Sequence, residues 1–338
     1  TKVTLKLHCE TRWSSKKRAV SALLYNIEKI YNILLEISTN DNLNKETTTG
    51  AKIILKQINF KFFCLLHMWN NILMAIDRVN CSLQDKGISI DIATNMIKGL
   101  LSLLQDIRGE YNDIINLSNL LANKLKLPSD FPETRKRKKN RTSSELAEDE
   151  GYMLTSKQEF ERECNMVFDS IISQIQWRFE KLNNIVSDFS FLIGKNLQSW
   201  STEYLKKCSV DLALKYSKDL DAAELCSEIE CFKFQAASLT SDLCEQSPLE
   251  LLNLIHTYTL NDAYPNIEIA LRIFLTLPVT VASCERSFSK LKIIKNYLRS
   301  SIGQDRLSNM AIISIESETA NHLNYDDIIE EFASIKSR

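Results

Sequence analysis

Residues 52–84 read KIILKQINFKFFCLLHMWNNILMAIDRVNCSLQ, and this stretch indicates the fold more clearly than any other part of the chain. Its apolar side chains recur every three to four residues, as they do along the buried face of an α-helix. The recurring residues are Ile53, Ile54, Ile58, Phe62, Leu65, Leu66, Trp69, Leu73 and Ile76. We therefore expect one long helix over 52–84 that is buried along a broad face.

The segments on either side carry the same periodicity. Residues 14–38 repeat it, and residues 89–125 predict a long helix that breaks or kinks near Gly99 or Gly109. Three long helices joined by short polar loops are typical of a bundle. Further helices are expected over 155–194, 203–216, 220–234, 248–258, 264–276, 281–299, 304–317 and 325–336, with N-caps at Asp219 and Ser247. The only strand that the pattern predicts is residues 3–9.

The composition supports a mostly helical chain. Its 338 residues include only 7 Gly and 5 Pro, far below average usage. Collagen-like, low-complexity and turn-rich all-β proteins are excluded, because they need Gly and Pro at their bends. A hydrophobic content of 44% with 25% charged residues also excludes a fully disordered chain. We predict a mainly α fold.

The sequence has no common catalytic or metal-binding motif. It lacks the phosphate-binding GxxxxGK[ST], the dinucleotide-binding GxGxxG, the zinc-binding HExxH and the nucleophile-bearing GxSxG. Its 9 Cys include no CxxC pair and its 4 His have no ligand spacing, which favours a reduced, intracellular compartment without a zinc site. No apolar run is long enough to span a membrane. We expect no metal site, no membrane association and no small-molecule substrate.

Three local features differ from this background. The first is CETRWSSKK at 9–17, and the second is the stretch LPVTVASCERSFSKLKIIKNYLRSSIGQDRLSNMAIISIE at 277–316. The third is a basic run followed by acidic residues within a predicted loop at 128–152. The basic run comprises Arg135, Lys136, Arg137, Lys138, Lys139 and Arg141. Each has a simple structural explanation, since Trp13 could anchor a core, Glu285 could be a solvated helix residue and charge runs are usually solvated.

Taken together, these features resemble the hAT superfamily of transposases and the host genes derived from them, particularly members described as zinc finger MYM-type-like. A TRW segment at the start of an inserted helical domain, a long helical body and then SCERSFSKLK, YLRSS and RLSNMAIISIE follow that family's order. The resemblance is strong over 265–338, good over 9–20 and diffuse between them.

The resemblance implies an RNase H-like catalytic fold that is split by a large helical insertion. Residues 1–13 would be a remnant leading into the insertion, residues 14–260 the insertion domain, and residues 265–338 the C-terminal dimerisation region. In the family, a zinc finger and two catalytic Asp lie upstream of the TRW motif. We therefore expect this chain to be an N-terminally truncated piece.

The resemblance also assigns roles to individual residues. Glu285 corresponds to the third carboxylate of a two-metal site, which would be vestigial here because the two upstream Asp are missing. We therefore expect no enzymatic activity and no cofactor, with Mg²⁺ relevant only to a longer product that holds the complete catalytic domain. Arg12 and Trp13 would contact DNA, Trp13 by stacking on a base, and the basic run 135–141 would contact phosphates.

The resemblance further implies a homodimer in the nucleus. The residues expected at its interface are Phe288, Leu291, Ile294, Leu298, Leu307, Met310 and Ile313. The leading hypothesis is a hAT-derived fragment that dimerises and keeps residual DNA binding. The alternative is a domesticated, all-helical nuclear interaction or scaffold protein with no nucleic-acid role, in which Trp13 and Glu285 are merely structural.

Overall fold

The computed structural model describes residues 4, 13–85, 88–131, 154–280, 282–296 and 299–336. Every regular element in these residues is a helix, which confirms the mainly α fold. The helices are α1 (Trp13–Thr39), α2 (Lys45–Gln57), α3 (Phe60–Leu83), α4 (Ile90–Ile107), α5 (Tyr111–Lys124), α6 (Ser156–Phe189), the 3₁₀ helix η1 (Ser190–Leu192), α7 (Gly194–Ser199), α8 (Thr202–Lys215), α9 (Ala222–Leu239), α10 (Pro248–Thr257), α11 (Pro265–Thr276), α12 (Ala282–Ile294), α13 (Gln304–Ile315), α14 (Ser317–Ala320) and α15 (Asp326–Lys336). The expected strand at 3–9 cannot be assigned, since of these residues only Thr4 is described.

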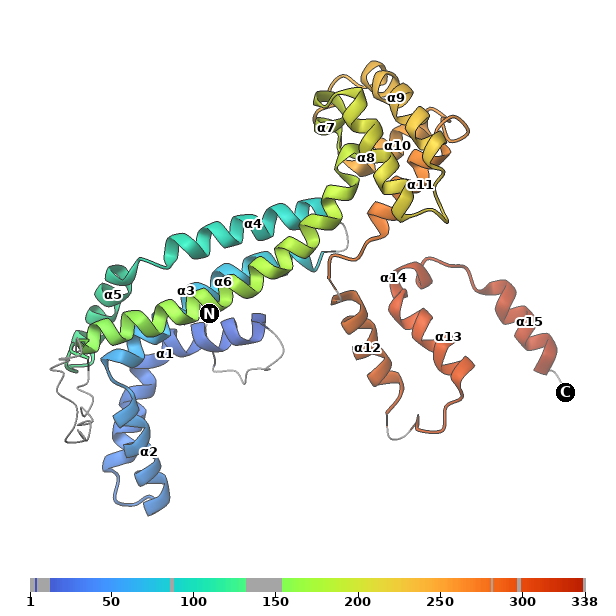
Figure 1. Ribbon diagram of the computed structural model, residues 1–338. Helices are drawn as coiled ribbons and strands as arrows, with labels where there is room; N and C mark the ends of the chain where they lie inside the picture. The colour runs from blue at the N-terminus through green and yellow to red at the C-terminus, as the bar shows by residue number, and fades with distance from the viewer. Residues whose placement is uncertain are drawn as a thin grey trace, which may run out of the picture. The chain divides into compact units, whose positions relative to one another are not determined.

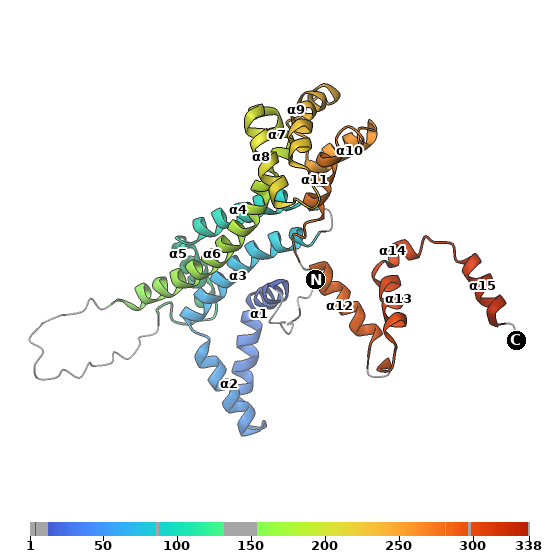
Figure 2. The same cartoon turned by 45° about the vertical axis from the view of Figure 1, so that its right-hand side comes forward.

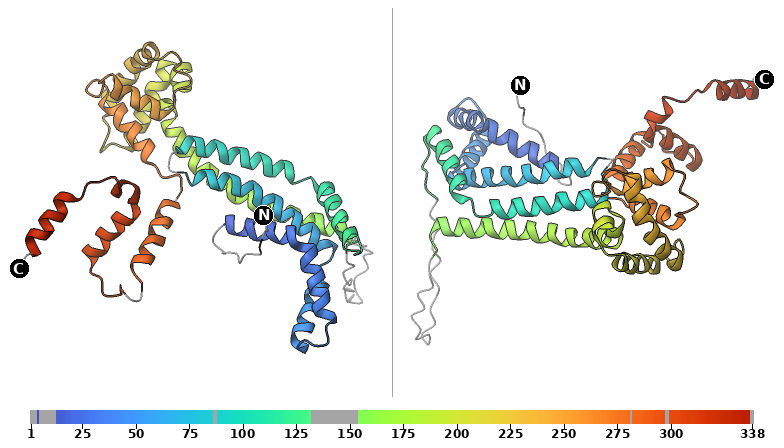
Figure 3. Two further views of the ribbon diagram at one scale, coloured as in Figure 1. Left: turned by 180° about the vertical axis from the view of Figure 1, so that it is seen from behind. Right: turned by 90° about the horizontal axis from the view of Figure 1, so that it is seen from above.

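The chain divides into two compact units, Thr1–Leu277 and Pro278–Arg338. In the first unit, α3, α4 and α6 lie side by side as the body of a bundle (Figure 3). The C-terminal half of α1 pairs with α2 and projects from this body (Figure 2). A helical bundle is present as expected, but α6 completes its body, whereas the expected bundle consisted of the helices over 14–38, 52–84 and 89–125. The large, fully buried side chains of the bundle include Ile27, Phe63, Met68, Ile72, Leu104, Phe160 and Phe168.

The single helix expected over 52–84 was wrong, because the structure has two helices there. The side-chain Oδ1 of Asn59 accepts a hydrogen bond from the backbone N–H of Phe62 at 3.0 Å, so Asn59 caps a new helix after α2 has ended. The long helix expected over 89–125 breaks at 108–110, around Gly109, whereas Gly99 lies inside α4.

Two predicted helix caps had different outcomes. Ser247 caps α10 as expected, and its backbone N–H in turn donates to Glu250 at 2.7 Å to complete a capping box. Asp219 was the wrong residue for the N-cap of α9. Asp221 caps it instead, accepting from the backbone N–H groups of two residues in the first turn at 2.9 Å each.

Helix α6 runs from the bundle into a second packed group within the same unit, formed by α7 to α11 (Figure 1). This group has its own aromatic core, in which Phe189 lies 5.2 Å from Phe274 between ring centroids. Gly194 begins α7 where the chain touches the 243–246 segment, and its N–H donates to the carbonyl of Gln246 at 3.1 Å. A Cβ at this position would overlap backbone carbonyl oxygens, so only glycine fits.

Two helices end in left-handed residues that are not glycine. Lys126 after α5 has φ 55°, and Thr259 after α10 has φ 52°. After α10, the N–H of Leu260 bonds the carbonyl of Ile255, and the N–H of Thr259 bonds that of His256, which is a Schellman ending. Glycine is the usual residue at this position because it adopts a positive φ without strain. The backbone at Lys126 and Thr259 is therefore strained.

No helix in the described part of the chain is long and apolar enough to cross a membrane.

Candidate self-association surface

Helices α12 and α13 pack against each other within the second unit. We call residues 282–315 the hairpin. Ile294 and Leu307 are buried between its helices, and Leu291 and Met310 are half-buried. These four residues, all expected at a dimer interface, contribute to packing within one copy. Leu298, also expected there, lies outside the described residues.

A lysine holds the two helices together at one end of the hairpin. The Nζ of Lys290 in α12 donates to the backbone carbonyl oxygens of Ser314 at 2.5 Å and Ile315 at 3.2 Å, the last two residues of α13. A cation at a helix C-terminus satisfies carbonyls that have no partner within the helix and complements the helix dipole. Sequence reasoning missed this role because the two partners lie far apart along the chain.

The outer surface of the hairpin exposes four large apolar side chains, those of Phe288, Ile293, Ile312 and Ile313. Phe288 is 69% exposed and Ile313 is 59% exposed, so these two expected interface residues remain available to a partner. Ile293 is 75% exposed and Ile312 is 61% exposed, but neither was predicted, because both lie off the periodic apolar pattern from which the interface residues were chosen. Clusters of exposed large apolar side chains mark interaction sites.

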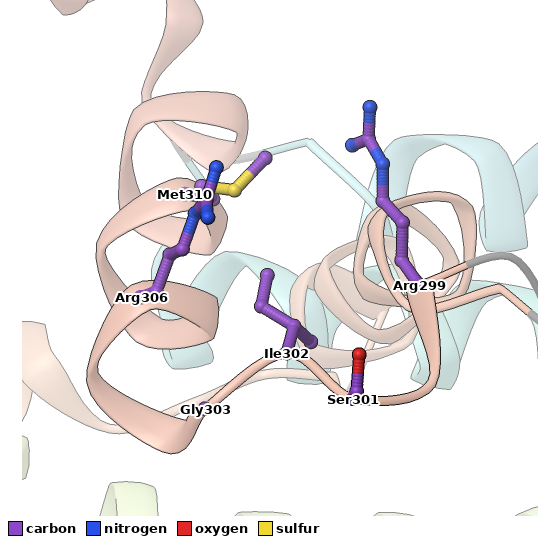
Figure 4. A pocket seen from close by; sticks show the side chains of 6 residues that line it. All are labelled: Arg299, Ser301, Ile302, Gly303, Arg306 and Met310. Carbon is purple, nitrogen blue, oxygen red and sulfur yellow. The ribbon is translucent and has the colours of Figure 1, made fainter.

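The turn of the hairpin is positively charged. Arg299, Ser301, Ile302, Gly303, Arg306 and Met310 line an open pocket of about 330 Å³ there. Figure 4 shows the side chains of Arg299 and Arg306 on opposite sides of Ile302, both pointing to the same side of the turn. The hairpin as a whole carries six Lys or Arg against two Asp or Glu over 282–315.

Glu285, the expected third carboxylate, is exposed on α12. It lies one turn from Phe288 on the outer side of the helix. No group of three His, Cys, Asp or Glu side chains that could hold a metal ion occurs among the residues that the structure describes. A two-metal site needs several carboxylates around each pair of ions, so the residues described do not fit such a site.

Of the expected DNA contacts, the structure describes only Trp13. This residue begins α1 and is 38% exposed, and the Nζ of Lys16 lies 5.4 Å from its ring centroid. An exposed aromatic face beside a cation is an arrangement that suits a nucleic-acid base and its phosphate. Arg12 and the basic residues 135–141 lie outside the described residues.

Within the first unit, a buried carboxylate joins α9 to α11. Glu228 accepts hydrogen bonds from the backbone N–H groups of Asn266 at 3.1 Å and Ile267 at 2.9 Å, and from the Asn266 side chain at 2.6 Å. Asn266 also donates to Glu224 at 3.2 Å and accepts from the backbone N–H of Asp221 at 2.9 Å. A negative charge thus caps the N-terminus of α11, where the first N–H groups lack partners within the helix.

Comparison with known proteins places these elements in a family context. Residues 222–319 match the hAT family C-terminal dimerisation region, a stretch that begins with α9, ends within α14 and includes Glu228, Asn266 and the hairpin. Two curated relatives, from human and mouse, are each named "52 kDa repressor of the inhibitor of the protein kinase". The human protein is 20% identical over 332 residues, and the mouse protein is 20% identical over 333.

These alignments cover 95% of this chain but only 42% of each relative, so the chain spans about two fifths of their length. No solved structure matches it. The chain therefore carries a segment, residues 222–319, that is similar to the hAT family C-terminal dimerisation region.

Proposed function

We propose that this chain is a hAT-derived protein that forms a homodimer through the outer surface of its hairpin. The exposure of Phe288, Ile293, Ile312 and Ile313 inside a matched dimerisation region is the observation that carries the proposal. Burying these side chains against a second copy removes apolar surface from water, which is the main driving force for association. In a dimer with two-fold symmetry, the interface would contain two copies of each of these side chains.

Sedimentation velocity on the full chain tests this proposal. Burial of one Phe side chain contributes about 1.5–3 kcal/mol, and two symmetric copies about twice that. Phe288→Asp is therefore expected to raise the dimer dissociation constant by about 10²- to 10⁴-fold. Leu120→Asp is the matched control, because Leu120 is also 69% exposed but lies in α5, outside the hairpin. Equal effects of the two substitutions would refute the assignment.

We further propose that the protein acts in the nucleus and binds DNA through Trp13, with the basic run 135–141 contacting phosphates. The Trp13–Lys16 pair supports DNA binding through Trp13. An aromatic ring can stack on any base, and a neighbouring cation strengthens the contact. Trp177 offers a matched control, being exposed in α6 with Lys181 6.0 Å from its ring centroid.

The DNA proposal is tested by measuring how strongly the protein binds single-stranded DNA and DNA stem-loops at several salt concentrations. Trp13→Ala is expected to weaken binding by about 1–3 kcal/mol and Trp177→Ala to leave it unchanged. Neutralising residues 135–141 should flatten the dependence of affinity on salt. If neither change alters binding, the DNA role is refuted. Imaging of the tagged protein tests the nuclear location.

We propose that this chain does not cleave DNA, because Glu285 alone matches the family's three catalytic carboxylates. The proposal would be contradicted if the chain nicked a DNA stem-loop in a metal-dependent reaction and Glu285→Gln abolished that nicking.

The alternative function is a domesticated interaction or scaffold protein without a nucleic-acid role. The name of the two relatives favours it, since that name describes a repressor rather than a transposase. Homodimerisation without any salt-dependent DNA binding would support this alternative.

A further inference from the structure

Helix α15 is the most strongly two-faced element of the second unit. Its apolar residues Ile328, Ile329, Phe332 and Ile335 are spaced to share one side of the helix, and each is between 61% and 71% exposed. Its acidic residues Asp326, Asp327, Glu330 and Glu331 occupy the rest of the helix surface. A helix with such a pattern is stable when its apolar side packs on a partner surface. Helix α15 lies beyond the matched region, which ends at residue 319.

The hairpin and α15 are complementary in charge. Helix α15 has four acidic residues against one basic residue, whereas the hairpin has six basic against two acidic. Both also expose large apolar side chains. An apolar contact surrounded by opposite charges is the arrangement that favours one partner and one orientation over others.

Local hydrogen bonds order the connection between α14 and α15. The hydroxyl of Tyr325 donates to the carbonyl of Ala320 at 2.6 Å, which ties the end of the connection to the end of α14. The N–H of Leu323 donates to the same carbonyl at 3.3 Å, and Asn324 accepts from the N–H of Asp326 at 2.9 Å at the start of α15.

We propose that α15 of one copy docks on the hairpin of a second copy, so that the two copies exchange their C-terminal helices. The apolar side of α15 covers the outer apolar residues of the partner's hairpin, and its acidic residues face Lys292 and Lys295. This inference rests on the proposed homodimer and names what each copy contributes to it. It also explains why so much apolar surface is exposed in a single copy.

Charge exchange in the full chain tests this proposal. The first variant carries Glu330→Lys and Glu331→Lys, and it keeps Asp326 and Asp327 because they complement the N-terminus of α15. The second carries Lys292→Glu and Lys295→Glu, and it keeps Lys290 because that residue caps α13. Each variant alone is expected to dimerise about tenfold more weakly than the unaltered chain, since each places like charges together.

An equimolar mixture of the two variants separates exchange between copies from docking within one chain. In a mixed dimer both contacts regain opposite charges, so heterodimers are expected to form with nearly the unaltered affinity. Absence of rescue in the mixture would overturn the exchange. Ile328→Asp should also weaken the dimer, and the equally exposed Leu323→Asp in the connection should not.

These experiments distinguish failure of the proposed homodimer from failure of the proposed exchange of α15. If the unaltered chain stays monomeric, the proposed function is wrong. If it dimerises and both charge variants dimerise equally well, only the exchange of α15 is wrong.

Discussion

Replacing Glu228 with alanine should destabilise the packing of α9 and α11, within the matched segment 222–319, more than any exposed substitution there. The carboxylate is 8% exposed and satisfies two backbone N–H groups at the start of α11, where Asn266 and Ile267 are themselves buried. Without Glu228 these donors have no partner and little access to water. Each buried donor left unsatisfied costs about 1–3 kcal/mol, so the substitution should lower the free energy of unfolding by about 2–6 kcal/mol.

The chain supplies a close control for this experiment. Glu224 lies one turn earlier on α9 and also accepts from the Asn266 side chain, at 3.2 Å, but it is exposed. Glu224→Ala is expected to change the free energy of unfolding by no more than about 0.5 kcal/mol. Glu228→Gln should fall between the two, because the amide keeps one acceptor oxygen but turns an NH₂ group toward the other donor.

Denaturant unfolding followed by circular dichroism gives the difference in stability, and amide hydrogen exchange locates it. The amide hydrogens of Asn266 and Ile267 should exchange much faster in Glu228→Ala and nearly normally in Glu224→Ala. If the two alanine variants unfold at the same denaturant concentration, Glu228 does not hold α11 in the way described.

Three further predictions concern the first unit. Gly194→Ala should destabilise the chain by several kcal/mol, because the added Cβ would overlap backbone oxygens. Gly99→Ala in α4 has open space and should stabilise the chain by about 0.5–1 kcal/mol, and thermal unfolding measures both changes. Thr259→Gly should add about 1–2 kcal/mol to the free energy of unfolding by relieving the left-handed backbone, and a loss of stability would contradict the Schellman ending of α10. Burial raises the pKa of Cys164 to about 12, so its thiol stays protonated near pH 8 and should react with a thiol reagent far more slowly than the exposed Cys231, as mass spectrometry of the labelled protein can show.

The helical content and most helix positions could be predicted from the sequence because long amphipathic segments carry a strong periodic signal. The boundary inside 52–84 could not, because apolar periodicity continues across Gln57 to Phe60 while a single Asn side chain starts a second helix. The choice between Gly99 and Gly109 could not be made either, because a glycine alone does not say where a helix breaks, and the space beside both residues is open.

The candidate surface was only partly predictable. Periodicity cannot distinguish an apolar residue that packs within the hairpin from one that faces outward, so Ile294 and Phe288 were grouped together although one is buried and the other exposed. The Glu228–Asn266 network was missed because its partners are 38 residues apart in sequence and neither residue belongs to a recognisable motif. The roles of Glu285 and Trp13 came from family resemblance, and they remain predictions.

The most direct test of the central claim is the mass of the unaltered full chain in solution, measured by multi-angle light scattering over a range of protein concentrations. The hairpin surface predicts a species of twice 38.8 kDa at micromolar concentration that dissociates on dilution. In the same measurement Phe288→Asp should remain a folded monomer. A constant mass of 38.8 kDa for the unaltered chain at every concentration would contradict self-association through the hairpin.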